Sequence, residues 1–287
     1  MREARLAYIL IAPAVLFLAI LVAYPFVMAI WMSLTSKRLG MSGAFVGLGN
    51  YLRLLDDDIF RQTAWNAVLY TGVAVAIKTV AGLALAMALA KLSRGAQLIR
   101  AIVLLPWVIP ISLSALAWWW MYDPLYSVFN WGLGQIGIHK IPWLSNPFWA
   151  RVAIITTNIW RGLPFYGLCI LAGLLAIPRE LYEAAETDGA GRLATFWYVT
   201  LPLLRPVLGT VILYSVVMTI SDFETIYLIT RGGPRNSTHL FSTLAYQVGL
   251  VGTEIGLGAA IVLFIFPVLA GAAFLLIRLV RQSEQIA

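Results

Sequence analysis

The sequence predicts an all-α polytopic membrane protein with six transmembrane helices. Hydrophobic residues make up 61% of its 287 residues and charged residues only 11%, which is too little charge to cover a soluble domain of this size. Six apolar runs are also long enough to cross a bilayer core, which takes roughly 20 residues per helix. These runs lie at about 6–34, 64–90, 98–122, 152–177, 203–229 and 255–279.

The first apolar run is longer than the core of a signal peptide, and no convincing small-residue cleavage site precedes the polar segment at Thr35. We therefore predict a retained span and a single transmembrane domain over residues 1–287. The only cysteine, Cys169, lies inside an apolar run, so no disulfide framework is expected.

Basic residues near the ends of the runs predict the orientation. The shortest connection carries Lys91, Arg94 and Arg100, and positive charge in short loops stays on the cytoplasmic side. Both chain ends are basic too, through Arg2, Arg5, Arg278 and Arg281. We predict that this loop and both termini are cytoplasmic, although the longer outer connections also hold basic residues.

The net charge of +7 does not predict a nucleic-acid partner. The arginines and lysines are scattered between apolar runs instead of gathering on one face. Orientation in the lipid bilayer explains them better.

One charged stretch, residues 178–202, separates the fourth and fifth runs. Pro178 and the acidic residues after it are typical of a helix start, and Gly189 of a helix stop. A second helical segment then leads towards Pro202. A solvated connector is one interpretation, but the small side chains at Ala184, Ala185 and Gly189 favour an element that docks closely against another helix.

This stretch resembles a known motif. The spacing matches the EAA loop of permease subunits in bacterial binding-protein-dependent ABC importers, with valine replacing the usual isoleucine at position 199. The matching residues are Glu183, Ala184, Ala185, Gly189, Val199, Leu201 and Pro202. Further stretches resemble the maltose- and glycerol-phosphate-type carbohydrate importers, over nearly the whole chain: FVGLGNYLRLL near residue 45, NIWRGLPF at 158–165 and LITRGGPRNST at 228–238.

The resemblance implies a permease subunit that carries a sugar or sugar derivative across the bacterial inner membrane by alternating access. It implies four partners: a second homologous permease, two ATPase subunits and an extracytoplasmic substrate-binding protein. The sequence has no G-x-x-x-x-G-K-[ST] loop. ATP and Mg are therefore assigned to the ATPase subunits, and this chain is predicted to be non-catalytic and to bind no cofactor. Glu183 would pair with a basic group on an ATPase.

Polar residues inside the runs are candidates for a substrate path, because such residues are costly at membrane depth and face the bundle interior. In the fourth run, Asn158, Arg161 and Phe165 recur at helical spacing beside Gly162. In the fifth run the corresponding polar stripe is Ser215, Thr219 and Asp222. The resemblance adds that positions matching Asn158, Gly162, Phe165, Thr219 and Asp222 line the sugar cavity in maltose-type permeases, although asparagines would be expected at 219 and 222.

Charged residues in the runs leave alternatives open. Arg161 could meet an anionic sugar derivative, or it could pair with Asp222 or Glu224 and hold two helices in register, which is the favoured interpretation. Lys78 is expected to have a buried partner. No metal site is predicted, because His139 and His239 stand a hundred residues apart without other ligands at suitable spacing. The run Trp118–Trp120 is interpreted as an interfacial anchor in preference to a surface on which a sugar stacks.

Two other function classes compete. An ion-coupled secondary carrier could use Lys78, Arg161 and Asp222 as a relay, but it predicts inverted repeats that are not evident, and it leaves the charged stretch unexplained. A membrane-embedded enzyme is the second alternative, but the sequence shows no nucleophile or acid–base constellation at the membrane face. The substrate stays open among mono-, di- and oligosaccharides, polyols, glycerol phosphoesters and sulfonated sugars, because the resemblance implies that a separate binding protein does much of the selection.

Overall fold

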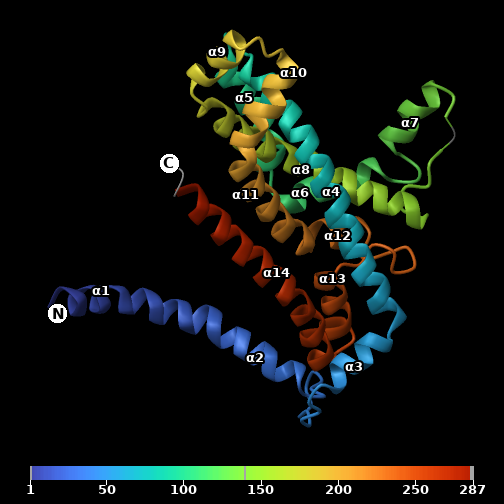
Figure 1. Ribbon diagram of the computed structural model, residues 1–287. Coiled ribbons are helices and arrows are strands. Elements are labelled where there is room, and N and C mark those ends of the chain that lie inside the picture. Colours follow the sequence, from blue (N-terminus) through green and yellow to red (C-terminus); the bar gives the residue numbers. More distant parts are fainter. Residues whose placement is uncertain (1, 139, 285–287) are drawn as a thin grey trace. The chain divides into compact units, whose positions relative to one another are not determined.

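The computed structural model describes the backbone of residues 2–138 and 140–284 (Figure 1). The side chains in these ranges are described except those of 2–7, 9, 276 and 279–284. His139 and the side chains of Arg2, Arg5 and Arg281, which entered the metal and orientation predictions, lie outside this set. The described chain is helical, with one isolated β-bridge between Thr35 and Phe45.

Within the described residues, five helical stretches are long and apolar enough to cross a membrane, and a bent pair raises the number to six. The all-α membrane class is therefore confirmed, with five or six candidate spans. The stretches are Leu10–Ser33, Asp58–Ala90, Pro147–Leu175, Arg192–Ile220 and Ile255–Leu275, and the bent pair is Ala96–Val108 with Ile111–Met121.

The third apolar run is not one continuous helix. It forms α5 (Ala96–Val108) and α6 (Ile111–Met121), which meet at an angle of 84°. The cause is Pro110, because a residue before proline is pushed out of the helical region, and Ile109 accordingly has φ −61° and ψ 133°. The prediction of a single helix at 98–122 is wrong at this break.

The fifth run is also interrupted. Helix α11 (Leu201–Ile220) ends before Asp222, and a short helix α12 (Glu224–Ile229) follows. The Oδ1 atom of Asp222 accepts a hydrogen bond from the backbone N–H of Thr225 at 3.1 Å, as a residue that caps a helix start does. Asp222 therefore lies between two helices and not on the continuous helix predicted at 203–229.

The described chain forms two compact units. The first contains the described residues up to Arg61 together with Leu244–Pro267, and the second contains Gln62–Thr243 together with the described residues from Val268. The remaining α-helices are α1 (Arg2–Leu18), α2 (Tyr24–Ser33), α3 (Gly49–Asp56), α4 (Asp58–Ala90), α7 (Val128–Gln135), α8 (Pro147–Leu175), α9 (Arg179–Thr187), α10 (Arg192–Thr195), α13 (Phe241–Tyr246) and α14 (Ile255–Glu284). Three π-helical turns lie at Ala19–Ala23, Phe196–Thr200 and Gln247–Val251.

In the first unit, polar contacts tie the loop after α2 to the segment before α14. Glu254 pairs with Arg38 at 3.1 Å and with Arg53 at 2.7 Å. The side chain of Asn50 donates to the carbonyl oxygens of Ser33 and Thr35. These contacts connect segments that are distant in sequence.

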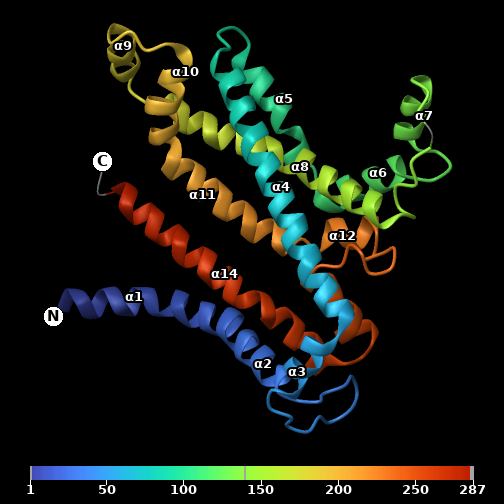
Figure 2. The same cartoon turned by 45° about the vertical axis from the view of Figure 1, so that its right-hand side comes forward.

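In the second unit, α8 packs against α5, α11 and α12 (Figure 2). Its core cluster draws buried apolar side chains from α4, α8 and α11. The fully or almost fully buried members are Ala86, Tyr166, Ile170 and Leu204. Lipid tails are as apolar as these side chains, so close packing and not burial from water holds the helices together in a membrane. This cluster packs together the three helices that carry most of the predicted substrate-path residues.

Glycines bring α4 and α8 close together. A Cβ atom added at Gly82 would lie 2.6 Å from Cβ of Tyr166, and one added at Gly167 would lie 2.6 Å from Cδ2 of Leu85. A Cβ atom at Gly162 would lie 2.8 Å from Cδ of Lys78. Any larger residue at these positions would force neighbouring atoms to move.

The tryptophan run is only partly as predicted. Trp118 is buried and packs on Phe129 and Trp160, with ring centroids 5.6 and 5.4 Å away. Trp119 and Trp120 are exposed. The anchor interpretation is therefore wrong for Trp118, whose ring belongs to an aromatic cluster.

Candidate functional site

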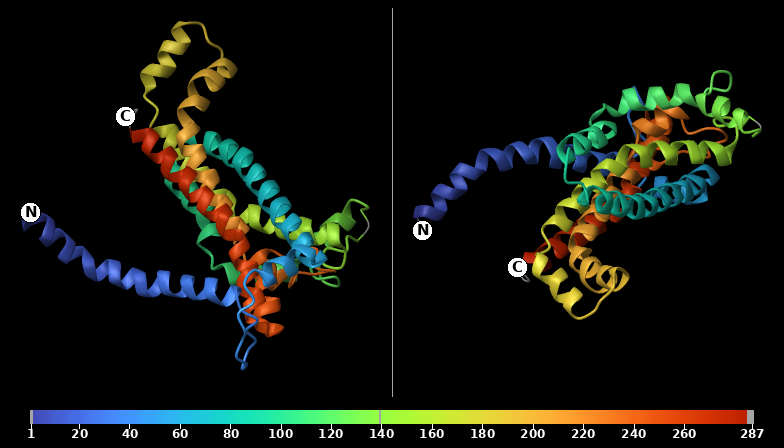
Figure 3. Two further views of the ribbon diagram at one scale, coloured as in Figure 1. Left: turned by 60° about the horizontal axis from the view of Figure 1, so that its bottom comes forward. Right: turned by 90° about the horizontal axis from the view of Figure 1, so that it is seen from above.

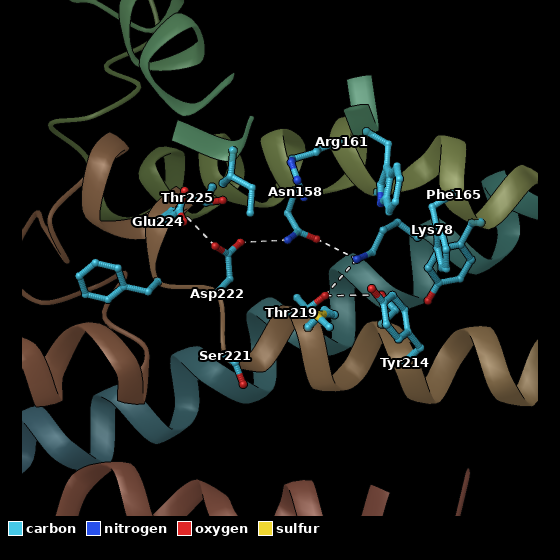
Figure 4. Close-up of a pocket in the computed structure, with 17 residues that line it drawn as sticks. Lys78, Asn158, Arg161, Phe165, Tyr214, Thr219, Ser221, Asp222, Glu224 and Thr225 are labelled. Atoms are coloured by element: carbon cyan, nitrogen blue, oxygen red, sulfur yellow. Dashed lines mark hydrogen bonds between the residues drawn. The ribbon is translucent and has the colours of Figure 1, made fainter. Parts of the chain in front are cut away.

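A cavity of about 490 Å³ lies in the second unit (Figure 4). Its volume falls in the range of roughly 300–1,000 Å³ that small-molecule sites occupy. Residues from α4, α5, α6, α8, α11 and α12 and from the segment between α11 and α12 line it. All the residues predicted for the substrate path are among them: Asn158, Arg161, Gly162, Phe165, Ser215, Thr219 and Asp222.

A hydrogen-bonded chain crosses the cavity from Lys78 to Asp222 (Figure 4). The Nζ atom of Lys78 donates to Oδ1 of Asn158 at 2.9 Å and to Oγ1 of Thr219 at 3.0 Å. The Nδ2 atom of Asn158 then donates to Oδ2 of Asp222 at 3.1 Å. Lys78 is only 3% exposed, and Thr219, at 1% exposed, is the buried partner that its position predicted.

The carboxylate of Asp222 accepts hydrogen bonds from three donors of the protein. Besides the amide of Asn158, it accepts a hydrogen bond from Oη of Tyr70 at 2.7 Å and one from the backbone of Thr225. Hydrogen bonds to a charged group contribute about 1.5–3 kcal/mol each. Asn158 bridges the side chains of Lys78 and Asp222, and the opposite charges of these two residues offset each other.

Arg161 does not form the ion pair that was favoured from the sequence. Among the ion pairs of the described residues, none joins Arg161 to Asp222 or Glu224. The Oε2 atom of Glu224 instead accepts a hydrogen bond from Ser112 at 2.8 Å. The Nε atom of Arg161 is buried and has no hydrogen-bond partner.

Three aromatic rings form one wall of the cavity. Phe165 stacks on Trp107 with centroids 5.6 Å apart and an interplanar angle of 18°, and it lies 5.1 Å from Tyr214. An apolar wall facing a few convergent polar groups is the usual construction of a small-ligand site. The cavity can therefore hold a ligand that has both an apolar face and hydrogen-bonding groups.

The residues of the charged stretch gather at another place, the α9–α10 hairpin (residues 178–202). Figure 3 shows this hairpin extending beyond the ends of α8 and α11. Glu183, Ala184 and Ala185 lie on α9, and Leu201 and Pro202 begin α11. Glu183 and Ala184 are exposed.

Gly189 ends α9 with the backbone in the left-handed region, at φ +78°. The N–H of Gly189 bonds to the carbonyl of Glu186 at 3.0 Å, and that of Ala190 to the carbonyl of Ala185 at 2.9 Å. This pair of bonds is the Schellman motif, which favours glycine at the left-handed position. A Cβ atom at Gly189 would contact nothing within 4 Å.

The model of the family described as "binding-protein-dependent transport system inner membrane component" matches residues 78–283. The chain belongs to this family. It is therefore a multi-pass inner-membrane component of a transport system, and its role is translocation and not catalysis.

Relatives cover nearly the whole of this transport component. It is 38% identical over 266 residues to the trehalose/maltose transport system permease protein MalF of Thermococcus litoralis, covering 92% of this chain and 90% of that protein. It is 36% identical over 282 residues to the sulfoquinovosyl glycerol transport system permease protein SmoG of Agrobacterium fabrum, covering 97% and 91%.

The fold of the transport component is also that of solved importers. A chain of a bacterial ABC transporter involved in the import of the acidic polysaccharide alginate superposes with a TM-score of 0.81 at 23% identity, covering 100% of this chain and 97% of that one. A second structure of an alginate transporter, in complex with a pentasaccharide-bound periplasmic protein, gives a TM-score of 0.79 at 23% identity, covering 99% and 96%.

Sequence reasoning missed several residues of this transport component's cavity. Trp107 was hidden because α5 and α6 were predicted as one straight helix. Tyr214 directly precedes Ser215 of the polar stripe, and this position next to a predicted lining residue could have identified it. Tyr70 does not line the cavity but donates to Asp222, and it gave no signal, because this contact depends on how α4 meets the segment after α11.

His239, a residue of the metal prediction, is packed inside a loop. It is 4% exposed, and its Nδ1 atom lies 3.1 Å from Oγ1 of Thr243. Burial lowers the pKa of His239 below its ordinary value of 6.5. Within the part of the chain that the structure describes, no three His, Cys, Asp or Glu side chains are grouped as metal ligands.

Proposed function

We propose that this chain is a permease subunit of an ATP-driven importer, and that it carries a sugar or sugar derivative by alternating access. The observation that carries the proposal is the cavity lined by α4, α8 and α11, which brings the aromatic wall of Phe165 together with the hydrogen-bonding groups of Asn158, Thr219 and Asp222. Sugars offer hydroxyl groups and apolar C–H faces, so they match both kinds of surface. Relatives named as trehalose/maltose and sulfoquinovosyl glycerol permeases support the same class.

The α9–α10 hairpin is proposed as the contact with the ATPase subunits. Its residues Glu183, Ala184, Ala185 and Gly189, with Leu201 and Pro202, would transmit closure of the ATPases to α8 and α11. The exposed Glu183 is available to a basic group, and the open space around Gly189 permits close approach. ATP and Mg would be held by those subunits.

The remaining assembly follows from the same proposal. A second homologous permease, two ATPase subunits and an extracytoplasmic substrate-binding protein would complete the importer, and the whole of residues 1–287 would act as one permease domain. Both termini and the hairpin would face the cytoplasm, as the basic residues Lys91, Arg94 and Arg100 indicate.

Purification from native membranes, followed by reconstitution, tests this function. The expected result is a complex that contains an ATPase pair and that takes up labelled carbohydrate only when ATP is inside the compartment and binding protein is outside. A matched preparation whose ATPase cannot hydrolyse ATP should bind but not accumulate substrate. Uptake driven by an ion gradient without ATP would contradict the proposal and support the secondary carrier.

A further inference from the structure

Four charged side chains, two cationic and two anionic, line the cavity: Lys78, Arg161, Asp222 and Glu224. Contacts within the protein account for three of them. Lys78 donates to Asn158 and Thr219, and Asp222 is held by Tyr70, Asn158 and Thr225. Glu224 accepts from Ser112.

Arg161 is the exception. The described residues place it in no ion pair, and its buried Nε atom lacks an acceptor. A guanidinium group cannot lose its proton in a protein, so neutralisation by deprotonation is closed to it. A charged side chain at membrane depth normally faces a partner or a water-filled path, and Arg161 faces the cavity.

The group that would satisfy Arg161 is an anion with two or more oxygens. Guanidinium presents its N–H donors in a planar fork that matches carboxylate, sulfonate and phosphate groups and distinguishes them from a single hydroxyl. Neither nearby carboxylate fills this role, because Asp222 and Glu224 are directed to Tyr70 and Ser112.

Arg161 and the aromatic wall are placed for one ligand. Phe165 stands four residues after Arg161 on α8, and side chains at this spacing lie on one helix face with Cβ atoms about 5–6 Å apart. Both line the same cavity, where Phe165 stacks on Trp107. A sugar ring against Phe165 would therefore bring a substituent on that ring to the guanidinium group. Figure 4 shows Arg161 beside Asn158 on the same helix.

We propose that the cavity receives an acidic sugar derivative and that Arg161 binds its anionic group, a carboxylate, sulfonate or phosphate monoester. The proposal rests on the proposed function, since it names the substrate class of that same cavity. It makes Arg161 the residue that separates acidic from neutral sugars.

The test measures binding to the assembled importer in nanodiscs without nucleotide, using four probes of matched ring size: glucose, glucuronate, glucose 6-phosphate and 6-deoxy-6-sulfoglucose. The expected result is that the Kd of at least one acidic probe is about tenfold or more below that of glucose. This ratio corresponds to the free energy of one charge-assisted hydrogen bond. The probe that binds most tightly identifies which anionic group is used.

Three variants make the test specific. Arg161→Gln should bring the Kd of the acidic probe to that of glucose without weakening glucose. Arg161→Lys should keep part of the preference, because it keeps the charge. Arg94→Gln, at an exposed residue of the short loop before α5, removes the same net charge and should leave the preference intact. Thermal unfolding of each complex identifies a variant that has failed to fold.

Three outcomes would overturn the inference: glucose binding as tightly as every acidic probe, no acidic probe binding at all, or Arg161→Gln weakening neutral and acidic probes equally. ATP-driven uptake by the same preparation separates the two proposals. A complex that lacks an ATPase pair contradicts the proposed function, whereas a complex that transports only neutral sugars contradicts the role of Arg161 alone.

Discussion

The Nζ atom of Lys78 on α4 lies 2.9 Å from Oδ1 of Asn158 on α8. This bond joins a cation in the second apolar run to an amide that was predicted to contact substrate. Since the other end of the amide donates to Asp222, Asn158 is held in one orientation before any ligand arrives. The cavity is in this sense preorganised.

Replacing Lys78 with methionine should destabilise the chain. The substitution removes the hydrogen bonds to Asn158 and Thr219 and a positive charge that offsets Asp222, so the free energy of unfolding should fall by about 1–3 kcal/mol. Titration with a denaturing detergent would measure it. The control is Lys91→Met, at an exposed lysine just after α4, and equal losses in the two variants would contradict the assignment.

Gly82→Ala should disturb the contact between α4 and α8. Its new Cβ atom would meet Cβ of Tyr166 at 2.6 Å, and overpacking of this kind costs about 1–3 kcal/mol. Gly72→Ala on the same helix is the matched control, because its Cβ atom would find open space and alanine favours a helix over glycine by about 1 kcal/mol. Thermal unfolding should therefore move in opposite directions. A parallel change would refute the close approach.

Gly189→Glu should uncouple the importer. A residue other than glycine at a left-handed position costs about 1–2 kcal/mol, which the fold can tolerate because the space around Gly189 is open. The larger effect is expected to come from a disturbed contact with the ATPase at the proposed site: uptake should be lost while ATP hydrolysis persists. Gly189→Asn is the control, since asparagine accepts this conformation more readily. Normal uptake by the glutamate variant would exclude a coupling role.

Acidification should open the loop around His239. Burial lowers the pKa of this imidazole below 6.5, so the folded loop binds fewer protons than the unfolded one. The stability contributed by the neutral ring is fully present above about pH 6.5 and is lost as pH falls through the lower pKa of the folded state. Hydrogen exchange at the amides of Thr238 and Leu240, corrected for intrinsic rates, should accelerate at low pH. His239→Asn should abolish this dependence.

The sequence predicts the helical class and the approximate positions of the spans because apolar length alone reports them. It fails at Ile109–Pro110 and at Asp222, where a window of about 20 residues averages over a local break. Pro110 was a readable signal for the first break. Asp222 was misplaced because its spacing from Ser215 and Thr219 fits a helical stripe, although it caps the start of α12.

The cavity was partly predictable for a similar reason. Asn158, Arg161 and Phe165 share one face of a single helix, so their meeting depends on local geometry. The contacts of Lys78 with Thr219 and of Tyr70 with Asp222 depend on the register between helices, which no local pattern reports. The pairing expected for Arg161 failed because the two carboxylates already had other donors.

The glycines that bring α4 and α8 together also limit how the protein can move. With Gly82 against Tyr166 and Gly167 against Leu85, neither helix can slide or rotate along the other without a steric collision. The pair should therefore move as one unit, and a substrate bound at Asn158, as proposed above, would move with both helices. The core cluster also packs α11 against this pair, so opening of the proposed path would come from displacement at the bend between α5 and α6.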